Sequence, residues 1–134
     1  MAEALRWIGI ARMGGNIVLG EEKSKALVKS GGAKLFLLAS DASPGAQRRA
    51  EGYVYGWDVP LLTVPYTKEE LAGAAGKAPC AMAAFSDTGL ASRFAADLQA
   101  EYGEKYREAA EALAEKAASA AARGRKSGNR RKNT

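Results

Sequence analysis

The chain has 134 residues, 47% of them apolar, so it can bury one hydrophobic core, and its length favours a single domain with at most an appendage. It contains one cysteine and no histidine, which excludes an internal disulfide and removes the residues that most often bind metal ions or act as general bases. No segment approaches the roughly 20 apolar residues that a membrane span needs, and no export signal is predicted. These properties favour a soluble protein of the reducing cytoplasm without a metal ion or cofactor.

The net charge of +5 is concentrated at the C-terminal end of the chain. Residues 123–134 contain six basic residues and no acidic residue, which leaves 14 basic and 15 acidic residues in the rest. A segment of this composition has no apolar area to bury, so we predict a disordered basic tail whose charges can bind RNA phosphates. A tail that only increases solubility is the alternative.

The first half of the chain reads as alternating helices and strands. Apolar residues at helical spacing predict a helix over about residues 4–13, followed by a short strand over 17–19. A second helix is predicted from about residue 21 to residue 30, where a pair of glycines ends it. The continuous apolar run at 35–39 is typical of a strand that is covered on both faces.

The second half continues this alternation. Apolar residues at helical spacing predict a helix that starts at Pro44 and is capped by Ser43. This helix is predicted to bury Trp57 in the core, so that Trp57 does not stack on bases. Thr67 and Glu70 form the signature of a capping box. The other predicted elements are a strand over 61–64, a helix over 68–75, a strand over 81–85 and a helix from 87 to 102.

Strands that alternate with helices favour an α/β fold, a three-layer α/β/α sandwich around a small sheet. Gly103 then interrupts the last helix, and the stretch after it is rich in alanine, glutamate and lysine. Its high helix propensity predicts a helical extension that needs little tertiary support. We therefore divide the chain into an α/β/α domain over 1–102, an Ala-rich extension over 103–122 and the basic tail over 123–134.

Two motifs could indicate catalysis, and neither has the right context. The triplet Asp87-Thr88-Gly89 matches the short signature of aspartic proteases, but those enzymes consist almost wholly of strands, whereas Asp87 precedes a predicted helix and is better explained as its N-cap. Cys80 lies just inside a predicted strand, and the chain has no histidine to activate it. The sequence therefore predicts that the protein is not an enzyme.

The helix predicted after Gly20 has the features of a nucleic-acid contact. Gly20 permits the close approach of another backbone, and the first turn of the helix offers unpaired N–H groups. Glu21, Lys25 and Lys29 recur every four residues along one face. The alternative is a solvated face held by intrahelical ion pairs.

Four blocks in a fixed order, 18–43, 59–62, 67–77 and 84–91, resemble the L7Ae/L30e superfamily of kink-turn RNA-binding ribosomal proteins, and most of all its YlxQ-type bacterial branch. The resemblance extends from about residue 5 to about residue 98. It implies that the sheet has four strands and is mixed, that the protein is not an enzyme, and that its partner is structured RNA, either ribosomal RNA or a kink-turn-like internal loop.

The resemblance also implies how individual residues act. Gly20 matches a glycine that permits close approach to bent RNA, Glu22 matches a glutamate that accepts from a guanine amino group, and Lys25 matches a lysine directed at guanine or phosphate. The loop over 76–80 matches a second contact region, which covers an extruded nucleotide. The predicted RNA-binding residues are Gly20, Glu21, Glu22, Lys25, Lys29, Lys77, Ala78 and Pro79.

Two positions depart from the family pattern. Kink-turn binders often carry asparagine where this chain has Glu21, and a carboxylate can only accept hydrogen bonds and repels phosphate. Asn16 stands where related sequences often carry a basic residue. Small Ala78 and Pro79 also offer less contact area than branched apolar residues. These departures weaken the expectation of tight binding to a standard kink-turn.

The sequence thus predicts a cytoplasmic bacterial RNA-binding protein. An alternative is a ribosome- or transcription-associated protein-interaction module that keeps the fold and docks through its Ala-rich helix and basic tail. A third hypothesis, a small-molecule enzyme, would be favoured by a sizeable polar pocket away from Gly20.

Overall fold

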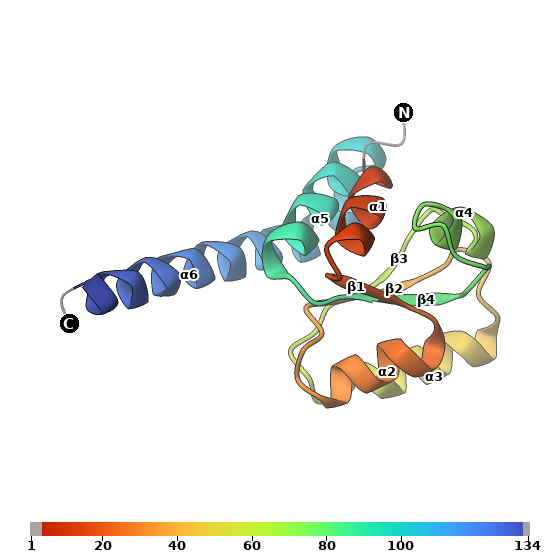
Figure 1. The fold of residues 1–134 in the computed structure, drawn as a ribbon. Helices are drawn as coiled ribbons and strands as arrows, with labels where there is room; N and C mark the ends of the chain where they lie inside the picture. The colour runs from red at the N-terminus through yellow and green to blue at the C-terminus, as the bar shows by residue number, and fades with distance from the viewer. Residues whose placement is uncertain (1–3, 133–134) are drawn as a thin grey trace.

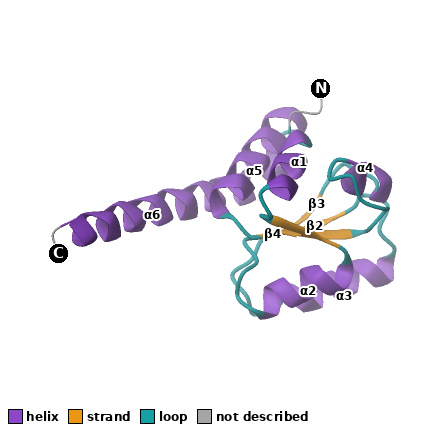
Figure 2. Cartoon of the chain, in the orientation of Figure 1, coloured by secondary structure: helices purple, strands orange, loops and turns teal. Residues whose placement is uncertain are grey.

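The structure is a computed structural model that describes the backbone of residues 4–132 and the side chains of residues 4–122. The tail predicted over residues 123–134 thus lies outside the described side chains. Helices and strands alternate in the predicted order (Figure 2). The elements are α1 (Arg6–Met13), β1 (Ile17–Leu19), α2 (Glu21–Lys29), β2 (Leu35–Leu38), α3 (Pro44–Val54), β3 (Leu61–Thr63), α4 (Lys68–Gly73), β4 (Met82–Phe85), α5 (Thr88–Tyr102), the 3-10 helix η1 (Glu104–Tyr106) and α6 (Arg107–Lys132).

The four strands form one mixed sheet in the order β1-β4-β2-β3. β4 is antiparallel to both of its neighbours, whereas β2 and β3 are parallel. Helices α2 and α3 cover one face of the sheet, and α1, α4 and α5 lie on the other face (Figure 1). The predicted three-layer α/β/α sandwich with a mixed four-stranded sheet is confirmed.

The central strands separate two hydrophobic clusters because their side chains alternate between the faces of the sheet. Leu35 and Leu37 of β2 belong to the cluster under α1 and α5, while Phe36 and Leu38 belong to the cluster under α2 and α3. All four side chains are buried. The apolar run is therefore a strand that is covered on both faces, as predicted.

Side-chain caps start the helices that follow strands β2 to β4. The Ser43 hydroxyl accepts from the Ala46 N–H at 3.1 Å, and Thr67 forms the predicted capping box with Glu70. The Asp87 carboxylate accepts from the Leu90 N–H at 2.8 Å. Asp87 is thus the N-cap of α5, as predicted from its position before a helix.

The prediction that the third helix buries Trp57 is wrong. α3 ends at Val54, because Tyr55 adopts extended ψ and Gly56 has φ +81°, a conformation that reverses the chain direction. Trp57 therefore lies in the loop before β3, with 44% of its surface exposed, and Tyr55 is also exposed.

The Ala-rich extension packs more closely than predicted. Tyr106, Ala110 and Leu113 are buried in the same cluster as α1 and α5, and the Tyr106 hydroxyl donates to the Thr63 carbonyl oxygen at 3.0 Å. The expectation of little tertiary support is therefore wrong for α6 as far as Lys116, which pairs with Asp58 of the domain. The C-terminal part of the helix projects away from the domain (Figure 1). The division of the chain at Gly103, which has φ +94° where α5 ends, stays a prediction.

Candidate nucleic-acid interface

The two predicted contact regions meet at one edge of the sheet. β1 and β4 are antiparallel, so the end of β1 lies beside the start of β4, and the Gly20 N–H donates to the Met82 carbonyl oxygen at 2.8 Å. Cys80 lies in the loop just before β4, in agreement with the predicted loop over 76–80 and not just inside the strand. Burial raises the pKa of the Cys80 thiol, and its hydrogen bonds with the backbone of Gly20 and Met82 oppose this rise. These contacts bring the start of α2 next to the loop that carries Lys77, Ala78 and Pro79.

The start of α2 is suited to a close approach by a ligand. Gly20 has φ +110° and ψ 150°, a conformation that side chains rarely permit, and it provides no side-chain cap for the helix. Ser24 and Val28 face the core and are buried, whereas Glu22 and Lys29 are exposed. Glu21 and Lys25 are half-buried, so only part of the charged face of the helix is open to solvent.

Four side chains from α2 and α3, which we call the Glu21 cluster, connect the two helices: Glu21, Lys25, Arg49 and Tyr53. Arg49 Nε donates to Glu21 Oε2 at 2.7 Å, and Arg49 Nη2 donates to Oε1 at 3.1 Å. The Tyr53 hydroxyl also donates to Glu21 Oε2. Lys25 Nζ lies 5.4 Å from the centroid of the Tyr53 ring, close enough for a cation–π interaction.

Arg49 and Tyr53 were not among the residues predicted to bind RNA, and both lie at this edge. Glu21 and Arg49 are 28 positions apart, and neither helical periodicity nor a local motif links residues at that separation. The two helices come together because both cover the same face of the sheet, which only the structure shows (Figure 1).

The cluster changes how Glu21 is understood. The hydrogen bonds from Arg49, and then from Tyr53, lower the pKa of Glu21 from its ordinary value of 4.5 to about 2. The carboxylate stays ionised near neutral pH, but the Arg49 guanidinium compensates its charge. The predicted repulsion of phosphate by a free carboxylate thus needs correction, because this carboxylate is already paired.

We expect the stabilising effect of this ion pair to depend on pH. A carboxylate with a lowered pKa contributes stability above its ordinary pKa, and this contribution is lost as the pH falls through about 2. The difference in melting temperature between the wild type and Glu21→Gln should therefore shrink from about pH 5 to about pH 2. Glu51→Gln, at an exposed carboxylate of α3 outside the cluster, controls for the general loss of charge. A wild-type to Glu21→Gln difference that is constant over this range would contradict the expectation.

The loop after α4 supplies the other side of this edge. Gly76 has φ +69° and turns the chain, and the Lys77 N–H donates to the Ala72 carbonyl oxygen at 3.0 Å. The side chains of Lys77, Ala78 and Pro79 are exposed. One cation and a small apolar surface therefore lie beside Gly20.

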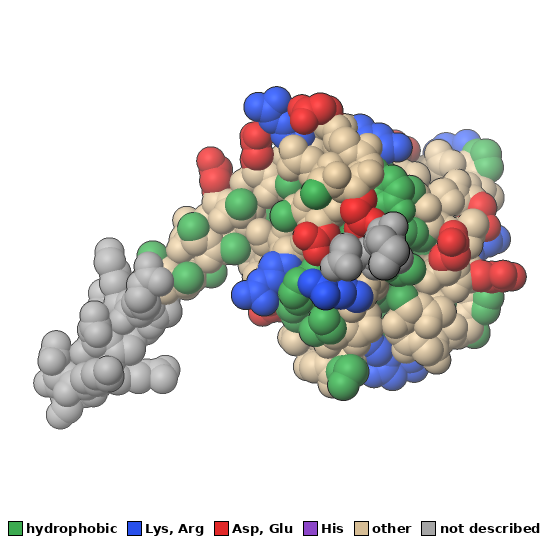
Figure 3. Space-filling view, turned by 90° about the horizontal axis from the view of Figure 1, so that it is seen from above, with side chains coloured by type: hydrophobic (Ala, Val, Ile, Leu, Met, Phe, Trp, Pro, Cys, Tyr) green, Lys and Arg blue, Asp and Glu red, His purple; other side chains and the backbone are tan. Residues whose placement is uncertain are grey.

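On the face formed by α1 and α5, by contrast, acidic and basic side chains are interspersed (Figure 3).

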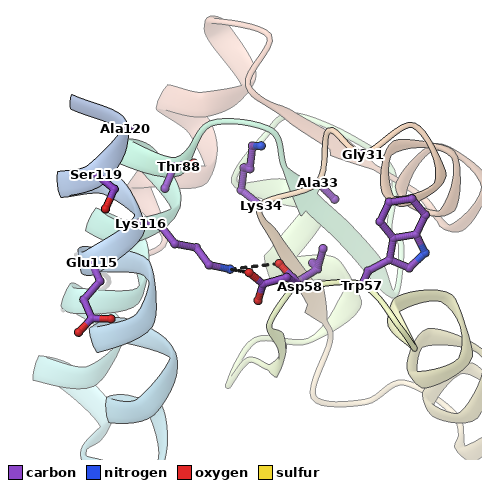
Figure 4. A pocket seen from close by; sticks show the side chains of 11 residues that line it. Gly31, Ala33, Lys34, Trp57, Asp58, Thr88, Glu115, Lys116, Ser119 and Ala120 are labelled. Carbon is purple, nitrogen blue, oxygen red and sulfur yellow. Dashed lines mark hydrogen bonds and ion pairs between the residues drawn. The ribbon is translucent and has the colours of Figure 1, made fainter. Parts of the chain in front are cut away.

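A pocket of about 540 Å³, lined by both polar and apolar residues, lies at the other end of the sheet, beside the residues that precede β2. Figure 4 shows Lys34 and Trp57 on its rim and the Lys116 side chain reaching from α6 to Asp58. Lys116 Nζ is 2.9 Å from Asp58 Oδ2 and also donates to the Asp58 carbonyl oxygen at 3.1 Å. Within the described residues, no group of three His, Cys, Asp or Glu side chains could hold a metal ion. The pocket thus contains an exposed ion pair between α6 and the loop before β3.

These features define a small α/β/α domain with a lysine-bearing helix and a loop joined at one edge of a mixed sheet. Residues 2–94 match the Ribosomal protein L7Ae/L30e/S12e/Gadd45 family, and the chain belongs to this family. Membership of this family supports RNA binding. In the described part of the chain, no helix has the length and apolar character needed to cross a membrane.

Two of the solved structures that are similar to this chain show its fold. A protein of unknown function from Bacillus halodurans is 24% identical, with a TM-score of 0.68 over 74% of this chain and 99% of that protein. The 15.5kD RNA binding protein of Giardia lamblia is 20% identical, with a TM-score of 0.60 over 81% of this chain and 85% of that protein. At these identities the likeness shows the shared fold. No curated protein matches the sequence.

Proposed function

We propose that this chain is a non-enzymatic bacterial protein of the YlxQ-type branch that binds structured, bent RNA in the cytoplasm. Its ligand is a kink-turn-like internal loop or ribosomal RNA. One observation carries the proposal: the start of α2 and the loop over 76–80 meet at Gly20, although they are more than 50 residues apart in the chain. Family membership supports the same class of ligand.

Each side of this edge has a distinct role in the proposed mechanism. Gly20 lets the RNA backbone approach α2, and exposed Glu22 accepts from a base amino group in the widened groove. Lys25 and Lys29 lie on successive turns and bind flanking phosphates. On the other side, Lys77, Ala78 and Pro79 cover the extruded nucleotide.

The test measures binding to a synthetic RNA that contains a kink-turn internal loop and to a plain duplex of the same composition. Lys25→Ala and Lys29→Ala should each weaken binding to the bent RNA, because each removes a phosphate contact. Each should also lower the slope of log affinity against log salt concentration by about 0.7 to 0.9.

Lys105→Ala is the matched control for Lys25→Ala. Lys105 Nζ lies 5.2 Å from the centroid of the Tyr106 ring, which reproduces the contact between Lys25 and Tyr53 on another part of the surface. Its loss should leave RNA binding unchanged. Unchanged affinity and salt slope in both α2 variants would remove this helix from the interface.

The second candidate function is a ribosome- or transcription-associated protein-interaction module. The observation that favours it is the projecting part of α6, where hydrophobic alanine side chains are exposed (Figure 3). This function predicts association with a ribosomal or transcription protein that the two α2 lysine variants do not weaken. Recovery and sequencing of RNA crosslinked to the protein in its own cells would favour the first function.

A further inference from the structure

We infer that Arg49 and Tyr53 of α3 are positioning residues of the RNA interface, which neutralise and orient the Glu21 carboxylate so that the start of α2 can approach RNA phosphates. This inference rests on the proposed function. It adds two residues from a second helix to the site, and it explains how the chain can carry a carboxylate at a position where related RNA binders often carry an amide.

The geometry of the ion pair supports this role. Arg49 engages both carboxylate oxygens of Glu21 through two different nitrogens, at 2.7 Å and 3.1 Å, which fixes the plane of the carboxylate. The Glu21 side chain is 31% exposed and that of Arg49 is 52% exposed, so the pair lies at the surface that RNA would reach. A carboxylate bound in this way carries a compensated charge, whereas a free carboxylate would repel a phosphate.

Gly45 gives the Arg49 guanidinium the room that it needs. A Cβ atom at Gly45, one turn before Arg49 on α3, would lie 3.3 Å from Arg49 Nη1, a tighter contact than ordinary van der Waals packing. The guanidinium therefore lies across the first turn of α3 on its way to α2. A larger residue at position 45 would push against it.

Tyr53 connects the carboxylate with the lysine that is proposed to bind RNA. Its hydroxyl donates to Glu21 while its ring lies under the Lys25 ammonium, at 5.4 Å from the ring centroid. One side chain thus holds two α2 residues of opposite charge one turn apart. The cluster keeps the cation of Lys25 available at the surface and keeps the anion of Glu21 occupied.

A double-mutant cycle tests the inference with the same kink-turn RNA. Arg49→Ala should weaken binding by about threefold to thirtyfold, within the range that coupled neighbouring residues show, because it leaves the Glu21 charge uncompensated. Glu21→Gln should bind at least as tightly as the wild type. In the Glu21→Gln background, the penalty of Arg49→Ala should fall to about twofold or less, since no charge remains to be neutralised.

Two further variants control the cycle. Arg48→Ala removes the exposed neighbouring arginine of α3, which lies outside the Glu21 cluster, and should change affinity less than Arg49→Ala. Tyr53→Phe keeps the ring under Lys25 and removes only the hydroxyl, so it should cause a smaller loss that also disappears in the Glu21→Gln background. Thermal unfolding of each variant shows whether it is folded, and Tyr53→Phe replaces Arg49→Ala in the cycle if the arginine variant does not fold.

Three results would overturn the inference. An equal Arg49→Ala penalty in both backgrounds, with a salt slope lowered by about 0.7 to 0.9, would make Arg49 a direct phosphate ligand. Weaker binding by Glu21→Gln would show that the carboxylate itself contacts RNA. Unchanged affinity of Arg49→Ala, while Lys25→Ala and Lys29→Ala bind more weakly, would remove only the positioning role. If the two lysine variants also bind like the wild type, the proposed interface itself fails.

Discussion

Replacing Leu113 with alanine should lower the free energy of unfolding by about 2 to 5 kcal/mol, although this residue belongs to the Ala-rich extension. Leu113 is fully buried, and it lies in the hydrophobic cluster that also contains Phe94 and Leu98 of α5. The substitution removes apolar contacts and leaves a cavity that the surrounding helices fill only in part. Chemical denaturation of the full chain measures the change.

Met13→Ala is the control for this substitution, because Met13 lies on α1 with 90% of its surface exposed. Its effect should stay within about 0.5 kcal/mol, as is usual for surface positions. If Leu113→Ala costs no more than this control, the first turns of α6 contribute little to the stability of the domain. The expected result would instead make the extension, up to Leu113, part of the folding unit.

Deletion of residues 123–134 should cause the largest change in the salt dependence of RNA binding. The segment carries six basic residues, and each one that binds a phosphate contributes about 0.7 to 0.9 to the slope of log affinity against log salt concentration. The deletion should weaken binding to bent RNA and plain duplex alike, because point charges do not read base edges. Affinities of the full and truncated chains over a series of salt concentrations test this.

The preference for bent RNA over duplex should survive the deletion, since the proposed recognition residues lie on α2 and in the loop over 76–80. Thermal unfolding should also be unchanged, because the deleted segment has no apolar side chain to bury. Loss of the preference for bent RNA would show that the tail carries recognition. Equal affinity before and after deletion would mean that the tail has no role in RNA binding.

The order and type of the elements could be predicted from the sequence because they depend on local properties. The apolar run of β2 required a strand covered on both faces, and short polar residues such as Thr67 and Asp87 marked the starts of helices. The mixed character of the sheet came from the resemblance to a family, because composition and periodicity do not determine strand direction. The proposed contact residues around Gly20 came from the same resemblance.

By itself, the sequence determined the alternation of helices and strands, the two-sided burial of β2 and the basic charge of the C-terminal segment, since these properties are encoded in neighbouring residues. Only the tertiary structure decided which distant side chains meet. It paired Glu21 with Arg49, exposed Trp57 in a turn and buried Leu113 against α5. Such contacts depend on how whole helices pack on a shared sheet, and side chains separated by tens of residues leave no periodic signal of that packing.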